Sequence, residues 1–453
     1  MAALLWDVQA EHLSEAETCV ERWDISLSSA IHTLDEVREG PEERLMAHTQ
    51  GLVIGGERVF ARLIQPVLAD DLNDDRFRTA AAALTLLDGG GREAPDRVLA
   101  HFPRARAEGW WGLIRAAHLS RRTDLAPRIL AEIEPLEGMA LAGRLEVLAG
   151  LGVDVGKPLR KWLRHDHPAI RRVAARLARH SSSSKILRLL LPLLRDPDPW
   201  LRAAAIESAL IRGLPGSWEA ACEAAFGRDV PKSVRRSALG WVAMQGDAEV
   251  HAKIFDLLEE RPSADLLWAA SITGRADAVM LALDLLDHPR LARLAGEVVT
   301  SITGLSTRDH QFWLDEGAAG RFGATANEAL PALAADDLDA ELVPPDELRL
   351  RLPNPERIRE CWAGSVERFS PAWRYVGGHP LDLASIDAAL RDAPMRRRHP
   401  LALELAIRCG GAGVLDTRAP ARIQITQSAA IFARLAAGLG SRELDFQGGF
   451  PIL

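Results

Sequence analysis

The chain has 453 residues and a formal net charge of −8, and hydrophobic residues make up 47% of it, whereas aromatic residues make up only 5%. Ala and Leu therefore supply most of the apolar mass, which favours helices over sheets. The negative charge argues against a surface built as a whole for nucleic acid or anionic lipid.

Other global features indicate a soluble protein in a reducing compartment. No window of 18 apolar residues occurs, and no basic residue precedes the first apolar run, so we expect neither a membrane span nor a signal peptide. The four cysteines lie far apart and form no C-x-x-C pair, a pattern typical of reduced thiols. We therefore expect a cytoplasmic protein that does not bind membranes.

Residues 1–56 predict helices that lack the periodic pattern seen further along the chain. Pro41 stands at a helix start and is followed by acidic residues, which complement the positive end of the helix dipole. Arrays of helical repeats need atypical ends to cover the first open apolar face. We therefore expect residues 1–56 to form an N-terminal helical cap.

Residues 57–305 repeat one pattern. Each unit has an apolar helix, a short polar turn that often holds Asp and Pro, and a second helix that opens with an aliphatic residue and Arg. Successive copies of this Arg are roughly 26 to 33 residues apart or a multiple of that spacing, which fits stacked pairs of short helices. The recurring arginines are Arg78, Arg171, Arg202, Arg235 and Arg293. The pattern predicts an all-α fold, an α-solenoid with helical caps at both ends.

A polar residue stands six positions before four of these arginines. These residues are His165, Asp196, Asp229 and Asp287. An acid at this place can accept from the free N–H groups at the helix start, and it can pair with the Arg of a neighbouring unit. We therefore predict a structural ladder along the array, built from the five arginines and the three aspartates.

The pattern is interrupted at residues 306–352, which hold ten acidic residues against four Arg, together with Gly and a Val-Pro-Pro turn. A loop this long is either disordered or functional, and its composition favours flexibility. Residues 353–453 return to helices joined by an Arg-bearing turn, so we expect C-terminal helical repeats and a cap. These boundaries divide the chain into segments 1–56, 57–305, 306–352 and 353–453.

The Asp-Pro turn followed by Arg resembles the HEAT-repeat family, well over residues 57–300 and loosely over residues 350–410. A narrower resemblance rests on the segments RLMAHTQGLVIGG, LAGEVVTSITGL, LPNPERIRECW, RYVGGHPL and RRRHPLALELAIR in that order. Together they look like an uncharacterised bacterial family of HEAT-like proteins often encoded near type VI secretion components. The resemblance implies an accessory or adaptor role, and it assigns no catalytic residue.

Two segments imitate sites of chemistry. His165, Asp166 and His167 form the most metal-like cluster, but the 31-residue period aligns them with Asp196-Pro197-Asp198, which indicates a turn. The segment GLGVDVGKP at 150–158 fails as a phosphate-binding loop, since Leu and Pro occupy two positions that the loop needs for Gly and Ser or Thr. We predict no catalytic residue, no metal and no cofactor.

Positive charge is concentrated in residues 157–212, which carry thirteen Lys or Arg against four acids, so the rest of the chain carries −17. The ladder cannot use all of these cations, and five of them are nominated as a binding surface: Arg172, Arg176, Arg179, Lys185 and Arg188. They are either solvated helix faces or a basic patch that docks an acidic protein segment or a phosphate backbone. The acidic segment 306–352 is one candidate partner, in the same copy or in another.

These features lead to one main functional hypothesis and one alternative. The main hypothesis is a non-enzymatic scaffold or adaptor that binds a protein or peptide. The alternative is a HEAT-like nucleic-acid-binding enzyme, such as an alkylated-base DNA glycosylase, which would use a basic face and exposed tryptophans. The tryptophans concerned are Trp110, Trp111, Trp200, Trp241 and Trp268, which equally fit packing between repeats. The net charge and the lack of a candidate catalytic acid argue against the alternative.

Overall fold

Helices supply nearly all the regular structure, which confirms the predicted all-α class. The structure is a computed structural model that describes residues 4–70, 74–315, 347, 349–438 and 444–449. Two compact units make up the chain. Unit 1 comprises residues 1–28, 32–217 and 410–440, and unit 2 comprises residues 29–31, 218–409 and 441–453.

Unit 1 begins with helices and short helical turns of the N-terminal segment: α1 (Trp6–Ser26), α2 (Leu34–Val37), η1 (Arg38–Glu42), α3 (Glu43–Ile54), α4 (Gly56–Val59), η2 (Phe60–Ile64) and α5 (Gln65–Ala69). The repeated part follows with α6 (Arg76–Gly89), η3 (Gly91–Glu93), α7 (Ala94–Leu99), α8 (Ala107–Leu119), α9 (Leu125–Glu132), α10 (Gly138–Gly150), α11 (Leu159–Trp162), α12 (Pro168–Leu177), η4 (Ala178–His180), α13 (Ser184–Leu187), η5 (Arg188–Arg195) and α14 (Pro199–Ile211). The unit also holds α25 (Ala421–Ala436).

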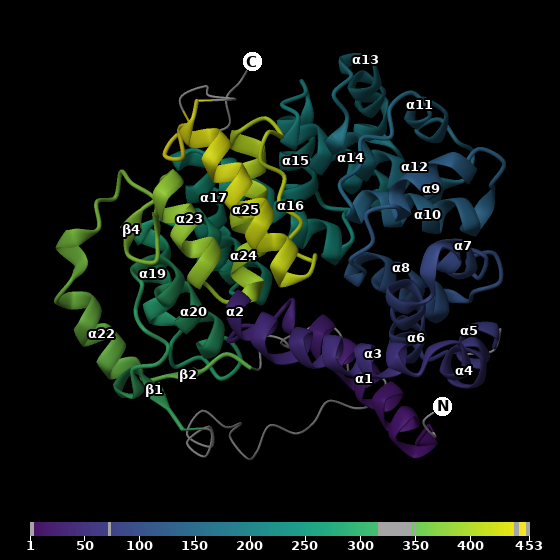
Figure 1. Cartoon of the computed structure of the whole chain (residues 1–453). Coiled ribbons are helices and arrows are strands. Elements are labelled where there is room, and N and C mark those ends of the chain that lie inside the picture. The colour runs from purple at the N-terminus through teal and green to yellow at the C-terminus, as the bar shows by residue number, and fades with distance from the viewer. Residues whose placement is uncertain (1–3, 71–73, 316–346, 348, 439–443, 450–453) are drawn as a thin grey trace, which may run out of the picture. The chain divides into compact units, whose positions relative to one another are not determined.

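The repeated part of unit 1 is a two-layer stack. The longer helices α6, α8, α10, α12 and α14 form one row, in which each packs against the next. The shorter helices α7, α9 and α11 and the turn η5 each pack on a member of that row (Figure 1). The helices α9, α11 and η5 each pack on the longer helix that follows and form a helix pair with it, as the repeat in the sequence predicts, whereas α7 packs on α6.

Small residues let the helices of this row approach closely. Ala80, Ala81, Ala82 and Ala83 of α6 are fully buried. At Gly112 of α8, a Cβ atom would lie 2.5 Å from the backbone oxygen of Arg76 at the start of α6, which is closer than real Cβ contacts come. The backbones of α6 and α8 therefore touch at a point where only Gly fits.

A buried acid joins α25 to the N-terminal helices of unit 1. Glu42 Oε1 accepts a hydrogen bond from Trp23 Nε1 at 2.9 Å and from the backbone N–H of Ala421 at 2.6 Å. Burial raises the pKa of Glu42, and the two donors oppose that effect. Residues 379 positions apart in the sequence thus share one hydrogen-bonded site.

Unit 2 contains the second set of helix pairs: α15 (Ser217–Phe226), which begins at the boundary, α16 (Lys232–Gln245), α17 (Ala248–Glu260), α18 (Ala264–Thr273), α19 (Ala276–Asp284) and α20 (Ala292–Thr303). Later elements are η6 (His310–Phe312), β1 (Trp313–Leu314), β2 (Leu352–Pro353), α22 (Pro355–Ala363), η8 (Val366–Arg368), β3 (Tyr375–Val376), β4 (His379–Pro380), α23 (Leu383–Asp392) and α24 (Met395–Arg408). Helices α16, α18 and α20 form one row, and α17 and α19 pack on it.

The segment predicted as an acidic insertion, residues 306–352, is described only at its ends and at Glu347. Residues 316–346 and 348 lie outside the described residues, so its predicted flexibility stays a prediction. Strands β1 and β2 pair antiparallel, with Trp313 opposite Pro353. The Glu347 carboxylate is buried 2.7 Å from Arg236 and 3.8 Å from Arg396, and burial raises the pKa of Glu347.

The predicted boundaries at residues 56, 305 and 352 also stay predictions. The described structure assigns residues 353–409 to unit 2 and residues 410–440 to unit 1, so the predicted C-terminal segment contributes to both units. Among the described residues no helix is both long and apolar enough to cross a membrane.

Candidate interaction surface

The turns before α12 and α14 have the same construction. Each helix begins with Pro, whose fixed φ suits the first helical position. The residue before Pro caps the helix: His167 Nδ1 accepts from the backbone N–H of Ala169 at 3.3 Å, and Asp198 Oδ1 accepts from Trp200 at 2.9 Å. The helix pairs that contain α12 and α14 are therefore related by a shift of 31 residues in the structure as well as in the sequence.

The residue two positions earlier stabilises the turn and does not cap the helix. His165 Nδ1 accepts from the backbone N–H of His167, and Asp196 Oδ1 accepts from Asp198, each at 3.0 Å. Both rings of the metal-like cluster thus accept hydrogen bonds from the backbone. Among the described residues no group of three or more His, Cys, Asp or Glu side chains could hold a metal ion.

The recurring Arg bonds backward to the backbone of its own turn. Arg171 Nη1 donates to the carbonyls of His165 and Asp166, both at 2.9 Å, and Arg202 Nη1 donates to the carbonyl of Asp196 at 3.0 Å. Since these carbonyls follow the first helix of the pair, the Arg fastens the end of the first helix to the start of the second. Arg235 in unit 2 does the same with the carbonyls of Gly227 and Arg228.

Contacts between neighbouring pairs are more varied than the predicted ladder. Nη2 of Arg171 lies 3.7 Å from Oδ2 of Asp196, which belongs to the next helix pair. The other predicted ladder residues have different surroundings: Arg78 pairs with Glu17 at 3.1 Å, Arg293 donates to the carbonyl of Leu350, Asp287 pairs with Arg359 at 2.6 Å, and Asp229 makes no ion pair with a described residue. The repeated feature is therefore the link from Arg to its own turn.

Two of the five cations nominated from the sequence tie consecutive long helices together. Arg176 of α12 pairs with Glu146 of α10 at 2.6 Å. Arg179, just after α12, pairs with Glu207 of α14 at 2.7 Å. Their charges are therefore engaged within unit 1.

The other three nominated cations, Arg172, Lys185 and Arg188, have side chains that bond to no described residue. Lys185 and Arg188 are exposed, and Arg172 is half-buried. Five further exposed cations, not nominated from the sequence, likewise have no described side-chain partner: Lys157, Arg160, Lys161, Arg164 and Arg195. They lie on or beside the short helices of their pairs. The sequence could have identified Lys157, Arg164 and Arg195, because Lys157 and Arg188 are 31 residues apart, as are Arg164 and Arg195.

Residues 156–239 match the family model of HEAT repeats. The match covers α11 to α14, the two helix pairs whose turns are equivalent, and reaches into α16. The helix pairs in this part of the chain are therefore HEAT-like, as the resemblance to that family predicted. Comparison with curated proteins and with solved structures yields no match.

A carboxylate joins the starts of the two short-helix segments in these HEAT repeats. Asp154, before α11, accepts from the backbone N–H and the hydroxyl of Ser182, before α13, both at 3.0 Å. Burial alone would raise the pKa of Asp154, but hydrogen bonds from Ser182 and Gly156 outweigh it and the pKa is lowered. The ionised form is thereby favoured, and it holds the two segments next to each other.

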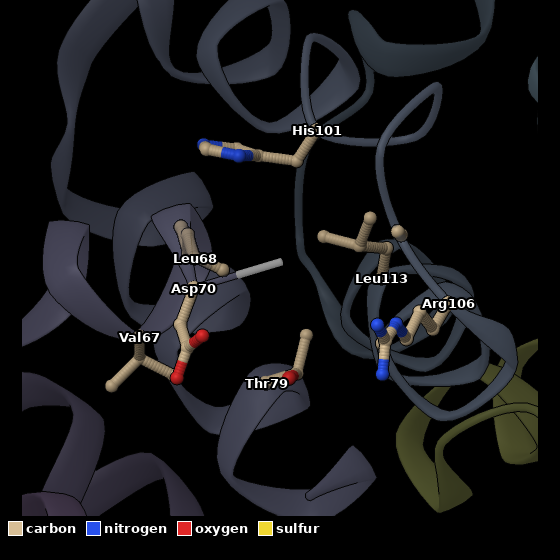
Figure 2. Close-up of a pocket in the computed structure, with 9 residues that line it drawn as sticks. Val67, Leu68, Asp70, Thr79, His101, Arg106 and Leu113 are labelled. Carbon is tan, nitrogen blue, oxygen red and sulfur yellow. The ribbon is translucent and has the colours of Figure 1, made fainter. Parts of the chain in front are cut away.

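The cavities described in the HEAT-like units are too small for a substrate. One in unit 1 has a volume of about 20 Å³ and is lined by Asp70, His101 and Arg106 among others (Figure 2). Another, in unit 2 beside Tyr375 and Glu404, is equally small. Each has room for one water molecule. The titratable groups in Figure 2 thus surround a space of about 20 Å³.

Most of the tryptophans considered for base stacking serve packing. Trp241 is buried, the rings of Trp111 and Phe77 meet edge to face, and Arg396 and Arg397 stack on Trp268. Trp200, at the start of α14, is 48% exposed. Of the five tryptophans, it offers the largest free aromatic face.

Proposed function

We propose that the protein is a non-enzymatic scaffold or adaptor that binds a protein or peptide partner through its HEAT repeats. The observation that carries this proposal is the set of exposed cations on α11, α13 and η5 that bond to no described residue. Stacked helix pairs present extended surfaces that suit partner binding, because each pair adds a similar face beside the last. The two cavities described above, one in each unit, have a volume of about 20 Å³ each, which fits a surface function better than turnover of a small substrate.

The proposal extends to the cellular setting. A cytoplasmic scaffold accessory to a type VI secretion system is supported by the resemblance of five sequence segments to a bacterial HEAT-like family. This finer proposal rests on sequence alone. It is tested by whether the partner captured by the scaffold is a secretion component.

Site-specific photo-crosslinking in the native host tests the scaffold proposal. A photoreactive benzoylphenylalanine replaces Arg160 on α11 in one variant and Arg172 on α12 in a second, so that both layers are probed. A third variant carries it at Arg104, an exposed residue between α7 and α8. We expect a discrete protein adduct at Arg160 or Arg172 and none at Arg104. Adducts to nucleic acid alone would refute the scaffold function.

The alternative of a nucleic-acid-binding enzyme has one observation in its favour, the exposed ring of Trp200 five residues after the exposed cation Arg195. DNA binding measured over a salt series separates the two functions, because contacts to phosphates release counterions and make the affinity fall steeply with salt. A steep fall that is lost on R164E with R195E would support the alternative. Arg176 is unsuitable for this test because it is bound to Glu146.

A further inference from the structure

Seven exposed cations form what we name the short-helix cationic surface of unit 1: Lys157, Arg160, Lys161, Arg164, Lys185, Arg188 and Arg195. They lie on α11, on α13 and η5, and in the turns beside them. None of their side chains bonds to another residue in the described part of the chain. Their ammonium and guanidinium groups are therefore available to an external anion.

The repeat geometry arranges these cations in rows. Pro168 and Pro199 both begin a long helix, so residues 31 positions apart occupy equivalent places on consecutive pairs. Lys157 is thereby equivalent to Arg188, and Arg164 is equivalent to Arg195. The hydrogen bonds from Ser182 to Asp154 hold the starts of the two short-helix segments together. Two rows of cations thus run from one HEAT repeat to the next.

The surface is positive in a chain that is otherwise acidic. Residues 157–195 carry eleven Lys or Arg and one acid, Asp166, so the rest of the chain carries −18. The cations of this range that pair with acids, Arg171, Arg176 and Arg179, stand on or just after the long helix α12. Apart from Arg172 on α12, the unpaired cations of this range stand on or beside the short helices. Like charges gathered on one surface repel one another unless an anion screens them, so an anionic partner would reduce this repulsion.

We propose that the short-helix cationic surface binds an acidic peptide segment of a protein partner. This inference rests on the proposed scaffold function and names the chemistry of the partner. A chain with Glu or Asp at every second position, in extended form, would present carboxylates along one face to both rows. Binding by many weak, exposed charge pairs predicts fast association that weakens with salt.

A peptide fits this surface better than a nucleic acid does. Charges are screened within about 8 Å at physiological salt, so a short acidic peptide senses only the local positive field. A longer polyanion would extend over parts of an acidic chain. Single strands also need several exposed aromatic faces for stacking. Trp162, which stands between Lys161 and Arg164, is only 2% exposed, so Trp200 after Arg195 is the one exposed tryptophan in this described stretch, residues 157–200.

Fluorescence anisotropy with the full-length protein tests the proposal. The probe is a labelled peptide of about 16 residues in which Glu and Ser alternate, so that the carboxylates share one face. A Gln and Ser version serves as the neutral probe, and a DNA duplex of similar charge serves as the competitor. The variant reverses four cations, one pair from each row: K157E, R164E, R188E and R195E. The matched control reverses four exposed arginines elsewhere in unit 1: R92E, R104E, R106E and R418E.

We expect the row variant to bind the acidic peptide at least about tenfold more weakly than the wild type, and the control variant to stay within about twofold. The neutral probe should not bind. All eight positions are exposed, so both variants should keep the helical circular dichroism spectrum of the wild type. Equal weakening by the two variants would overturn the proposal, because net charge alone would then explain binding.

Stronger binding of the DNA duplex than of the peptide would also overturn the proposal and assign the surface to nucleic acid. These outcomes are separable from a failure of the scaffold function. If photo-crosslinking captures a protein partner at Arg172 while the row variant binds the acidic peptide normally, the scaffold function is supported and the acidic-peptide site is refuted. If the peptide result holds but no protein is captured, the scaffold function fails instead.

Discussion

Arg374 and Glu404 form a fully buried ion pair in unit 2, with Nη1 of Arg374 at 2.5 Å from Oε1 of Glu404 and both side chains at most 3% exposed. The same guanidinium donates to the carbonyls of Thr273, Met244 and Phe446. One side chain therefore joins the ends of α18 and α16 to α24 and to residues 444–449. Buried pairs of this kind depend on both partners, because either charge alone is poorly solvated.

We expect E404Q to destabilise unit 2 by about 3 kcal/mol, since Arg374 would keep its charge in a buried place without a counterion. Hydrogen–deuterium exchange of amides in α16 and α24 measures the loss. The control is E360Q, which removes an exposed partner of Arg357 and should change stability by less than about 0.5 kcal/mol. Similar protection in both variants would show that the buried pair contributes little.

A second prediction compares neighbouring arginines of α12. R171A removes two hydrogen bonds from a charged group to the carbonyls of His165 and Asp166, and we expect it to destabilise unit 1 by about 2 kcal/mol. R172A removes a side chain that bonds to no described residue and should cost less than about 0.5 kcal/mol. Urea unfolding followed by exchange of the α12 amides measures both. Equal effects would refute the proposed role of Arg171 in fastening the turn.

A third prediction concerns the cap of α14. D198A removes the acceptor for the backbone N–H groups of Trp200 and Leu201 and should destabilise the helix start by about 1 kcal/mol. The control is D166A, because Asp166 is exposed and its carboxylate bonds to no described residue. Faster exchange of the first-turn amides of α14 in D198A alone is the expected result. If D166A has an equal effect, capping is not the cause.

The fourth prediction is a pH dependence from His251 in unit 2. The ring is buried, its Nδ1 accepts from Arg275 Nε at 3.3 Å, and its Nε2 donates to the carbonyl of Ala243 at 2.9 Å. This arrangement fits the neutral ring. Burial, with the positive charge of Arg374 added, lowers the pKa of His251 to about 3. The folded state thus resists protonation that the unfolded chain accepts near pH 6.5.

The unfolded state therefore binds more protons than the folded state between pH 6.5 and about 3. The contribution of His251 to the free energy of unfolding is complete above pH 6.5 and is lost as the pH falls through that range. The contribution is on the order of 5 kcal/mol. We expect H251Q to flatten the pH dependence of unit 2 stability relative to the wild type, whereas H379Q, at an exposed His, should leave it unchanged. Exchange of the α17 amides at several pH values measures the slope. An unchanged slope in H251Q would contradict the prediction.

Several features could be predicted from the sequence because they depend on chemistry within a few residues. The Pro that begins α12 and α14 and the Arg three positions later repeat at 31 residues, so the helix pair was visible without a structure. The reinterpretation of His165 and His167 as turn residues followed from the same alignment, and both rings accept backbone hydrogen bonds. The all-α class followed from Ala and Leu content.

Partners distant in sequence could not be predicted in this way. Arg172 and Arg176 stand one helical turn apart and looked equivalent, yet only Arg176 meets an acid, Glu146 on the helix before. That contact depends on how α10 and α12 rotate against each other, which the 31-residue period does not fix. The nominated cations therefore separated into paired and unpaired groups only in the structure.

By itself the sequence determined the helical class, the repeat period and the chemistry of the turns, since propensity, capping and the Pro and Arg positions act locally. Only the tertiary structure decided that Arg374 is buried against Glu404, that Ala421 bonds to Glu42 across 379 positions, and which cations remain exposed. The physical reason is that burial and charge pairing depend on distances between helices, whereas a periodic sequence records only which face each residue occupies.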